Sequence, residues 1–278
     1  MGEYHFIISN INIQIIPTPF KKASSGLNIS DNWYPSHHNT SRTHFIKKMV
    51  QTFRYFGHGM TKPYTTLSNF NECIIRGYLF VETEGKFEER EYIFPCSEHY
   101  WWAHFMRRHE DISRLAVGGD LSTIDGLKLI LGDFIGETKG RYWGRKGSIG
   151  IVAKILTQKN EKGERYRAKE IGMCVNDYPL EQYGPSGGNS TLVSIWKKIL
   201  FAKYTQNSIH RAVLMSTGSE ILVDFTRGTP EKKFWTAHVV NGGKRYSAGR
   251  IVGGELVGNN FMGKCMMAVR KEMYGNSY

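Results

Sequence analysis

Two strand-like runs around a glycine-containing turn limit the possible folds of this chain more than any other feature. Residues 72–83 and 91–94 are rich in β-branched and aromatic side chains, and residues 84–90 between them read EGKFEER. Such runs on either side of a short turn are typical of a β-hairpin. The N-terminal half of the chain is therefore expected to contain an antiparallel sheet.

Helical patterns dominate the rest of the chain. Apolar residues recur with helical spacing in six segments, at residues 97–109, 122–134, 145–157, 190–204, 208–217 and 260–273. A hairpin followed by many helices predicts the α+β class. We expect a helix-rich single domain with a small antiparallel β-sheet.

The domain is expected to span residues 51–275. Residues 1–50 contain a stretch rich in Ser, Asn, Thr, His and Pro, which predicts a partly irregular N-terminal extension. Insertions are expected near 158–189, which is charged and then glycine-rich, and near 240–253, which is basic and glycine-rich.

Charge and cysteine content narrow the classes of partner and site. The 278 residues carry a formal net charge of +12, which favours polyanions such as nucleic acid, anionic membranes or phosphorylated ligands.

The four cysteines are far apart and form no CxxC pair, so no zinc site and no disulfide framework are predicted. Reduced cysteines and the lack of a signal peptide favour an intracellular protein, cytoplasmic or nuclear and not secreted, and no long apolar run indicates a membrane. No metal and no cofactor are predicted.

A carboxylate among aromatic rings is the first candidate for catalysis. If residues 97–109 form one helix, Glu98, Trp101, Trp102 and Phe105 share a face, and Ser97 is placed to cap it. Burial against the rings raises a carboxyl pKa, whereas the helix N-terminus favours the charged form. Glu98 is then either a general acid or base, or a residue that only supports its own helix terminus.

Two lysines border apolar helix faces. Lys203 continues the stripe formed by Leu192, Ile195, Trp196, Ile199 and Leu200, and Lys154 follows Ile151 by three positions. Such a lysine usually extends its amine to solvent at the helix end. Less often it is a desolvated amine with a lowered pKa that can attack a sugar C1.

Several short stretches, in the same order along the chain, resemble motifs of the NADAR family, the YbiA-like proteins. They lie between about residue 53 and residue 273, and they comprise FRYFGHG at 53–59, LSNF at 67–70, SEHY at 97–100, GR at 140–141, FAKYTQN at 201–207, LMSTGSEILVD at 214–224, FW at 234–235 and GNNFMGKCMMAVR at 258–270. The resemblance implies a YbiA-like/NADAR fold. It also implies an N-glycosidase that hydrolyses the bond between a ribose C1 and a nitrogen.

The resemblance leaves three functions open. The first is removal of ADP-ribose from guanine bases in DNA, which the basic charge favours by attracting nucleic acid. The second is cleavage of small phosphorylated ribosylamino-pyrimidines of riboflavin synthesis. The third is a non-catalytic module that binds ADP-ribose or nucleic acid. This last alternative draws on two departures from the family pattern: Phe105 replaces a lysine that many relatives place after the glutamate, and Lys232 stands where an acidic residue is frequent.

The resemblance also implies the site residues. Glu98 is expected to stabilise oxocarbenium-like charge or to activate the nucleophile, and Asp224 to act as an alternative base. Since Phe105 occupies the usual lysine position, Lys154 is the expected nucleophile, through a Schiff base with the ring-opened sugar, and Lys203 the partner of a phosphate. The remaining expected substrate contacts are Asn69, Phe70, Trp102, Arg141, Trp143, Trp235 and Asn260.

Overall fold

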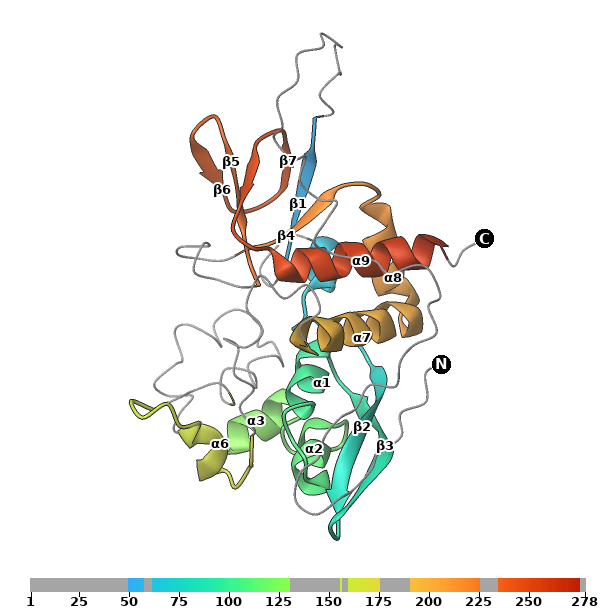
Figure 1. Ribbon diagram of the computed structural model, residues 1–278, viewed down its shortest axis with the longest axis vertical. Helices are drawn as coiled ribbons and strands as arrows, with labels where there is room; N and C mark the ends of the chain where they lie inside the picture. The colour runs from blue at the N-terminus through green and yellow to red at the C-terminus, as the bar shows by residue number, and fades with distance from the viewer. Residues whose placement is uncertain are drawn as a thin grey trace, which may run out of the picture. The chain divides into compact units, whose positions relative to one another are not determined.

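The computed structural model describes residues 50–57, 62–130, 156, 160–175, 191–225 and 235–275, all within one compact unit (Figure 1). The predicted extension at 1–50 lies outside these residues except for Val50, and so does the predicted helix at 145–157 except for Leu156.

The predicted hairpin is present. Strand β2 (Ile75–Thr83) pairs antiparallel with β3 (Lys86–Phe94), in a register that runs from Ile75↔Phe94 to Thr83↔Lys86. The connecting Glu84 and Gly85 both have positive φ, 52° and 76°, as a two-residue turn between right-twisted strands requires. Pairing extends through the charged 86–90 segment, so β3 begins five residues before the predicted run.

A second sheet brings distant parts of the chain together. Strand β1 (Thr52–Phe56) lies between β4 (Ile221–Asp224), which runs parallel to it, and β7 (Arg250–Val252), which runs antiparallel. The parallel register places Phe56 beside Asp224, so β1 and β4 end together. The sequence predicted antiparallel pairing only, so the parallel pair of β1 and β4 was not predicted.

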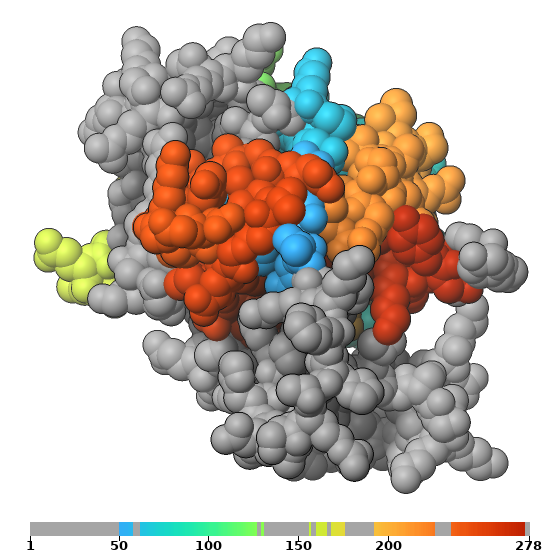
Figure 2. All heavy atoms as spheres, turned by 90° about the horizontal axis from the view of Figure 1, so that it is seen from above, coloured from blue at the N-terminus to red at the C-terminus, as the bar shows by residue number. Residues whose placement is uncertain are grey.

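The glycine-rich segment near 240–253 is largely strand. Strands β5 (His238–Asn241), β6 (Lys244–Tyr246) and β8 (Glu255–Val257) form an antiparallel sheet in the order β6-β5-β8. The view from above in Figure 2 shows residues of this sheet, in orange-red, beside β1, in blue. The hydroxyl of Tyr55 in β1 joins the two, because it donates to Tyr246 O at 2.7 Å and accepts from Val239 N at 2.6 Å.

Helix α7 organises the packing of the helices. It packs on α1 and β2 and on α8 and α9, and Figure 1 shows it alongside α9. The bounds are α1 (Ser97–Ala103), α2 (His109–Leu115), α3 (Ile124–Ile130), α6 (Tyr166–Glu170), α7 (Thr191–Gln206), α8 (Ser208–Ser216) and α9 (Phe261–Gly275), with a 3₁₀-helix η1 (Tyr64–Leu67). These helices and the small sheets confirm the predicted α+β class.

The single helix predicted at 97–109 is wrong, because the chain breaks into α1 and α2. Helix α1 ends at Ala103, and the backbone carbonyl of Arg107 then accepts a hydrogen bond from Glu82 N of β2 at 2.9 Å. This bond holds the segment between α1 and α2 at the edge of the hairpin. Phe105 therefore lies beyond α1, although its ring still contacts those of Trp101 and Trp102, with centroids 5.0 and 5.2 Å away.

The predicted cap of this helix is also wrong. Cys96 occupies the capping position and makes no side-chain capping bond, and Ser97 is the first helical residue. The Ser97 hydroxyl is buried, with no hydrogen-bond partner in the part of the chain that the structure describes.

Candidate active site

Glu98 lies in the first turn of α1 and is buried, with 9% of its surface exposed. Its Oε1 accepts a hydrogen bond from Trp102 Nε1 at 3.1 Å, and its backbone N donates to Asn69 O at 3.2 Å. Burial raises the pKa of Glu98 to about 7, and the bond from Trp102 only partly opposes that rise. A carboxyl group in this condition changes its protonation near neutral pH, as an acid–base catalyst must.

Asp224 is the second carboxyl group of the site. It is the last residue of β4, at the carboxyl end of the parallel β1–β4 pair, and its side chain is half-buried. The pKa of Asp224 is raised to about 8, first by the loss of solvent around it and then by the negative charge of Glu98. The two carboxyl groups, which are far apart in the sequence, therefore act on each other electrostatically.

Asn260 holds the strand that carries Asp224. This residue is fully buried and adopts a positive φ of 50° just before α9. Its Oδ1 accepts from Asp224 N at 3.1 Å, and its Nδ2 donates to Leu222 O at 2.7 Å. Asn260 therefore supports the strand that carries Asp224, and its expected contact with a substrate stays a prediction.

Gly263 and Gly57 make room for this arrangement. A Cβ atom at Gly263 would lie 2.2 Å from Leu222 O and 2.5 Å from Asn260 Nδ2, so α9 can approach β4 only with glycine there. Gly57 has a φ of 126°, and a Cβ there would lie 3.4 Å from Asp224 Oδ1. Neither glycine was predicted as part of the site, although a glycine inside a helical pattern, such as Gly263, often indicates a packing constraint.

Lys203 is fully buried, so its expected extension to solvent is wrong. Its Nζ donates to the backbone carbonyls of Thr66 at 3.0 Å and Ser68 at 2.8 Å. Burial lowers the pKa of this amine. Lys203 therefore supports the turn that precedes Asn69. Its ammonium group lies against backbone carbonyls, although the expected partner of this group was a phosphate.

Asn69 presents a polar group that the protein itself does not satisfy. Its Oδ1 is buried and has no hydrogen-bond partner among the described residues, and its Nδ2 donates only to the weak acceptor Met262 Sδ, at 3.6 Å. Its backbone carbonyl binds Glu98 N, so this amide belongs to the same site as the glutamate. A buried acceptor without a donor is a natural contact for a ligand N–H or O–H group.

The aromatic residues divide into core and accessible rings. Trp101 stacks on Trp196 with centroids 4.7 Å apart, and both are buried, whereas Trp235 meets Trp101 edge-on at 5.7 Å and is half-buried. Trp102 is 5% exposed, so its chief contribution here is the N–H bond to Glu98. Among the expected substrate contacts that the structure describes, Phe70 and Trp235 are thus the aromatic rings that are partly exposed and could stack on a base.

His99 supports the helix that carries Glu98. Its Nε2 lies 3.0 Å from Leu121 O and its Nδ1 3.0 Å from Cys96 Sγ, and burial lowers its pKa to about 4. The ring is therefore neutral at pH 7, with Nε2–H as donor and Nδ1 as acceptor of the thiol proton.

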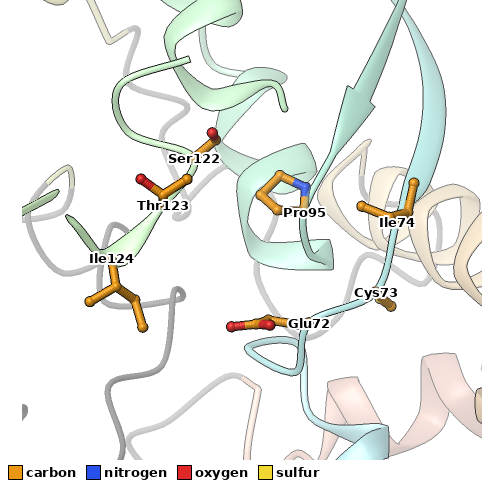
Figure 3. A pocket seen from close by; sticks show the side chains of 7 residues that line it. All are labelled: Glu72, Cys73, Ile74, Pro95, Ser122, Thr123 and Ile124. Atoms are coloured by element: carbon orange, nitrogen blue, oxygen red, sulfur yellow. The ribbon is translucent and has the colours of Figure 1, made fainter. Parts of the chain in front are cut away.

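Other expected features lie elsewhere. Arg141, Trp143 and Lys154 fall outside the described residues. A cavity of about 440 Å³ is lined by none of the expected site residues. Its lining consists of Glu72, Cys73, Ile74, Pro95, Ser122, Thr123 and Ile124 (Figure 3).

Within the described ranges, no three His, Cys, Asp or Glu side chains gather as a metal site would require. No helix in these ranges has the length and apolar character to cross a membrane.

Comparison with solved structures finds a match, whereas the two other comparisons find none. No family model and no curated protein matches the chain. The NMR structure of the E. coli protein YbiA matches over 84% of this chain and 93% of that chain, with 17% sequence identity and a TM-score of 0.41.

Proposed function

We propose that this chain is an N-glycosidase that hydrolyses a ribose C1–N bond and removes ADP-ribose from guanine bases in DNA. The observation that carries the chemistry is the pair Glu98 and Asp224, two carboxyl groups from distant segments whose pKa values are both raised into the neutral range. The choice of substrate rests on the NADAR-like motifs and on the net charge of +12, which attracts a polyanion.

The pair supplies both proton transfers of a hydrolysis. With a pKa of about 8, Asp224 is largely protonated at pH 7 and can give its proton to the leaving guanine nitrogen as the C1–N bond breaks. Glu98, with a pKa of about 7, is partly ionised and can stabilise the positive charge at C1. The amine of Lys154 then adds to C1 and gives a proton to Glu98, the sugar ring opens to a Schiff base, and water hydrolyses this imine to release the free sugar and restore the amine.

The direct test is release of ADP-ribose from an oligonucleotide that carries ADP-ribosyl-guanine. We expect free ADP-ribose and an oligonucleotide with unmodified guanine. Cleavage of a phosphorylated ribosylamino-pyrimidine alone would show that the substrate is a small riboside. Binding of the oligonucleotide without release would favour a non-catalytic module.

The same reaction tests Lys154 as the nucleophile. An amine that captures the ring-opened sugar forms a Schiff base, which borohydride reduces to a stable adduct. We expect the adduct on the peptide that contains Lys154. An adduct on Lys203 would reverse the two roles, and the absence of any adduct during turnover would favour direct attack by water with Glu98 or Asp224 as base.

Asn69→Ala is expected to raise KM about 10-fold, with a smaller effect on kcat. Loss of one hydrogen bond to the substrate corresponds to about 1.4 kcal/mol of binding free energy. Because Asn69 Oδ1 lacks a partner within the described protein, the variant should melt at the wild-type temperature or above. Steady-state kinetics and thermal melting check both points. Asn241→Ala removes a half-buried amide of β5 that donates to Val252 O, and it is the matched control that should leave KM unchanged. A drop in stability of Asn69→Ala without a change in KM would assign Asn69 a structural role.

A further inference from the structure

The outer face of the β2–β3 hairpin displays aromatic side chains. Tyr78, Phe80 and Phe87 are 50%, 52% and 47% exposed. The opposite face is buried on α1, α2 and α7, as the alternating burial of β2 requires. Figure 1 shows the hairpin as a long ribbon beside these helices. Exposed large rings on one face of a sheet are typical of an interaction surface.

Each of these rings has a carboxylate directly across the hairpin. The register pairs Tyr78 with Glu91, Phe80 with Glu89, and Glu82 with Phe87. Directly opposite residues of an antiparallel pair share a face, with Cβ atoms about 5 Å apart. Rings and carboxylates therefore form three adjacent pairs, repeated at every second residue, or about 6.6 Å along the strands.

The charge of this face is opposite to that of the chain. Arg76 is the positive residue of the face and forms an exposed ion pair with Glu91 at 3.4 Å, which leaves Glu82 and Glu89 in excess. The pKa of Tyr78 on this face is raised first by a hydrogen bond to the side chain of Glu91 and then by the negative charge of Glu91. A polyanion such as DNA is repelled here, although the chain as a whole carries +12.

We infer that this face binds an extended, basic protein segment with lysine or arginine at every second position. A cation fits over an aromatic ring beside a carboxylate, where it gains both a cation–π contact and an ion pair. Alternate side chains of an extended segment repeat at about the same 6.6 Å interval as the three pairs. The contacts between this face and the basic segment involve none of the residues proposed for the glycosidase reaction. Binding at the hairpin and the proposed activity can therefore be tested independently.

The test is the binding of a fluorescein-labelled peptide of four Arg-Ser repeats, measured by fluorescence anisotropy. At about 0.1 M salt the screening length is near 10 Å, so local charges on the hairpin outweigh distant positive ones. We expect this peptide to bind at least about 5-fold more tightly than one with the same residues in two blocks, because only the alternating order matches the three pairs. Equal affinity for the two peptides would overturn the proposal.

Variants then locate the binding surface. Replacement of Glu82, Glu89 and Glu91 by Gln is expected to weaken binding about 10-fold, as is Tyr78→Ser combined with Phe87→Ser. Replacement of the exposed Glu72, Glu161 and Glu255 by Gln removes the same charge elsewhere and should leave Kd within about 2-fold. An equal loss in this control would overturn the proposal. Sedimentation that shows a wild-type dimer and a monomeric hairpin variant would assign the face to a second copy of the chain instead.

Discussion

Glu98→Gln is expected to reduce release of ADP-ribose about 1,000-fold or more while the protein stays folded. Glutamine has nearly the same shape as glutamate, and its Oε1 can still accept the bond from Trp102 Nε1. The variant therefore loses the charge that stabilises the sugar cation and the ability to take up a proton. Single-turnover rates on the modified oligonucleotide, with circular dichroism to verify the fold, measure the effect.

The stability of the same variant, relative to the wild type, should increase as the pH rises. The pKa of Glu98 is about 7 in the folded protein and near 4.5 when unfolded, so the folded state retains its proton more strongly. The stability that this gives is fully present below pH 4.5 and is lost as pH rises through 7. The variant should therefore gain stability over the wild type between pH 4.5 and pH 8, by an amount on the order of 3 kcal/mol.

Two outcomes would contradict this assignment. Near-wild-type turnover by a folded Glu98→Gln protein would remove Glu98 from the mechanism. An unchanged difference in melting temperature between pH 4.5 and pH 8 would show that the carboxyl group is not held in its neutral form. Glu161→Gln, at an exposed position, is the control that should change neither quantity.

The sequence predicted elements whose signals are local. The hairpin and the helices now seen as α7, α8 and α9 follow from the spacing of apolar residues within short windows. The parallel pair of β1 and β4 joins short strands, of five and four residues, from the two ends of the domain. No pattern within either strand indicates its partner, because a parallel pairing depends on the path of everything between them.

The candidate site shows the same division. Glu98 could be selected from its neighbours alone, because the surrounding rings and the helix start are visible in the sequence. Asp224 came only from the resemblance, since its raised pKa depends on burial and on a carboxyl group from another segment. Lys203 and Asn260 were predicted as substrate contacts, and the sequence did not predict the hydrogen bonds that their polar atoms make to backbone groups. Residue type gives the chemistry, but only packing decides what a side chain faces.

Gly263→Ala is expected to destabilise the protein by about 3 kcal/mol and to lower activity together with stability. The added Cβ would lie 2.2 Å from the Leu222 carbonyl oxygen and 2.6 Å from Asn260 Oδ1. The first of these atoms belongs to the backbone of β4, so α9 must move away from the strand. That movement breaks the hydrogen bonds through which Asn260 holds Leu222 O and Asp224 N.

The second glycine of the same helix provides the control. A Cβ at Gly275, the last residue of α9, meets nothing within 4 Å, so Gly275→Ala should be neutral or stabilise by up to about 1 kcal/mol. Urea unfolding of both variants measures the difference. If the two alanines have equal effects, α9 does not pack on β4 as closely as proposed. If Gly263→Ala is as unstable as expected but a folded fraction keeps full activity, then the support that Asn260 gives to Asp224 is not needed for the reaction.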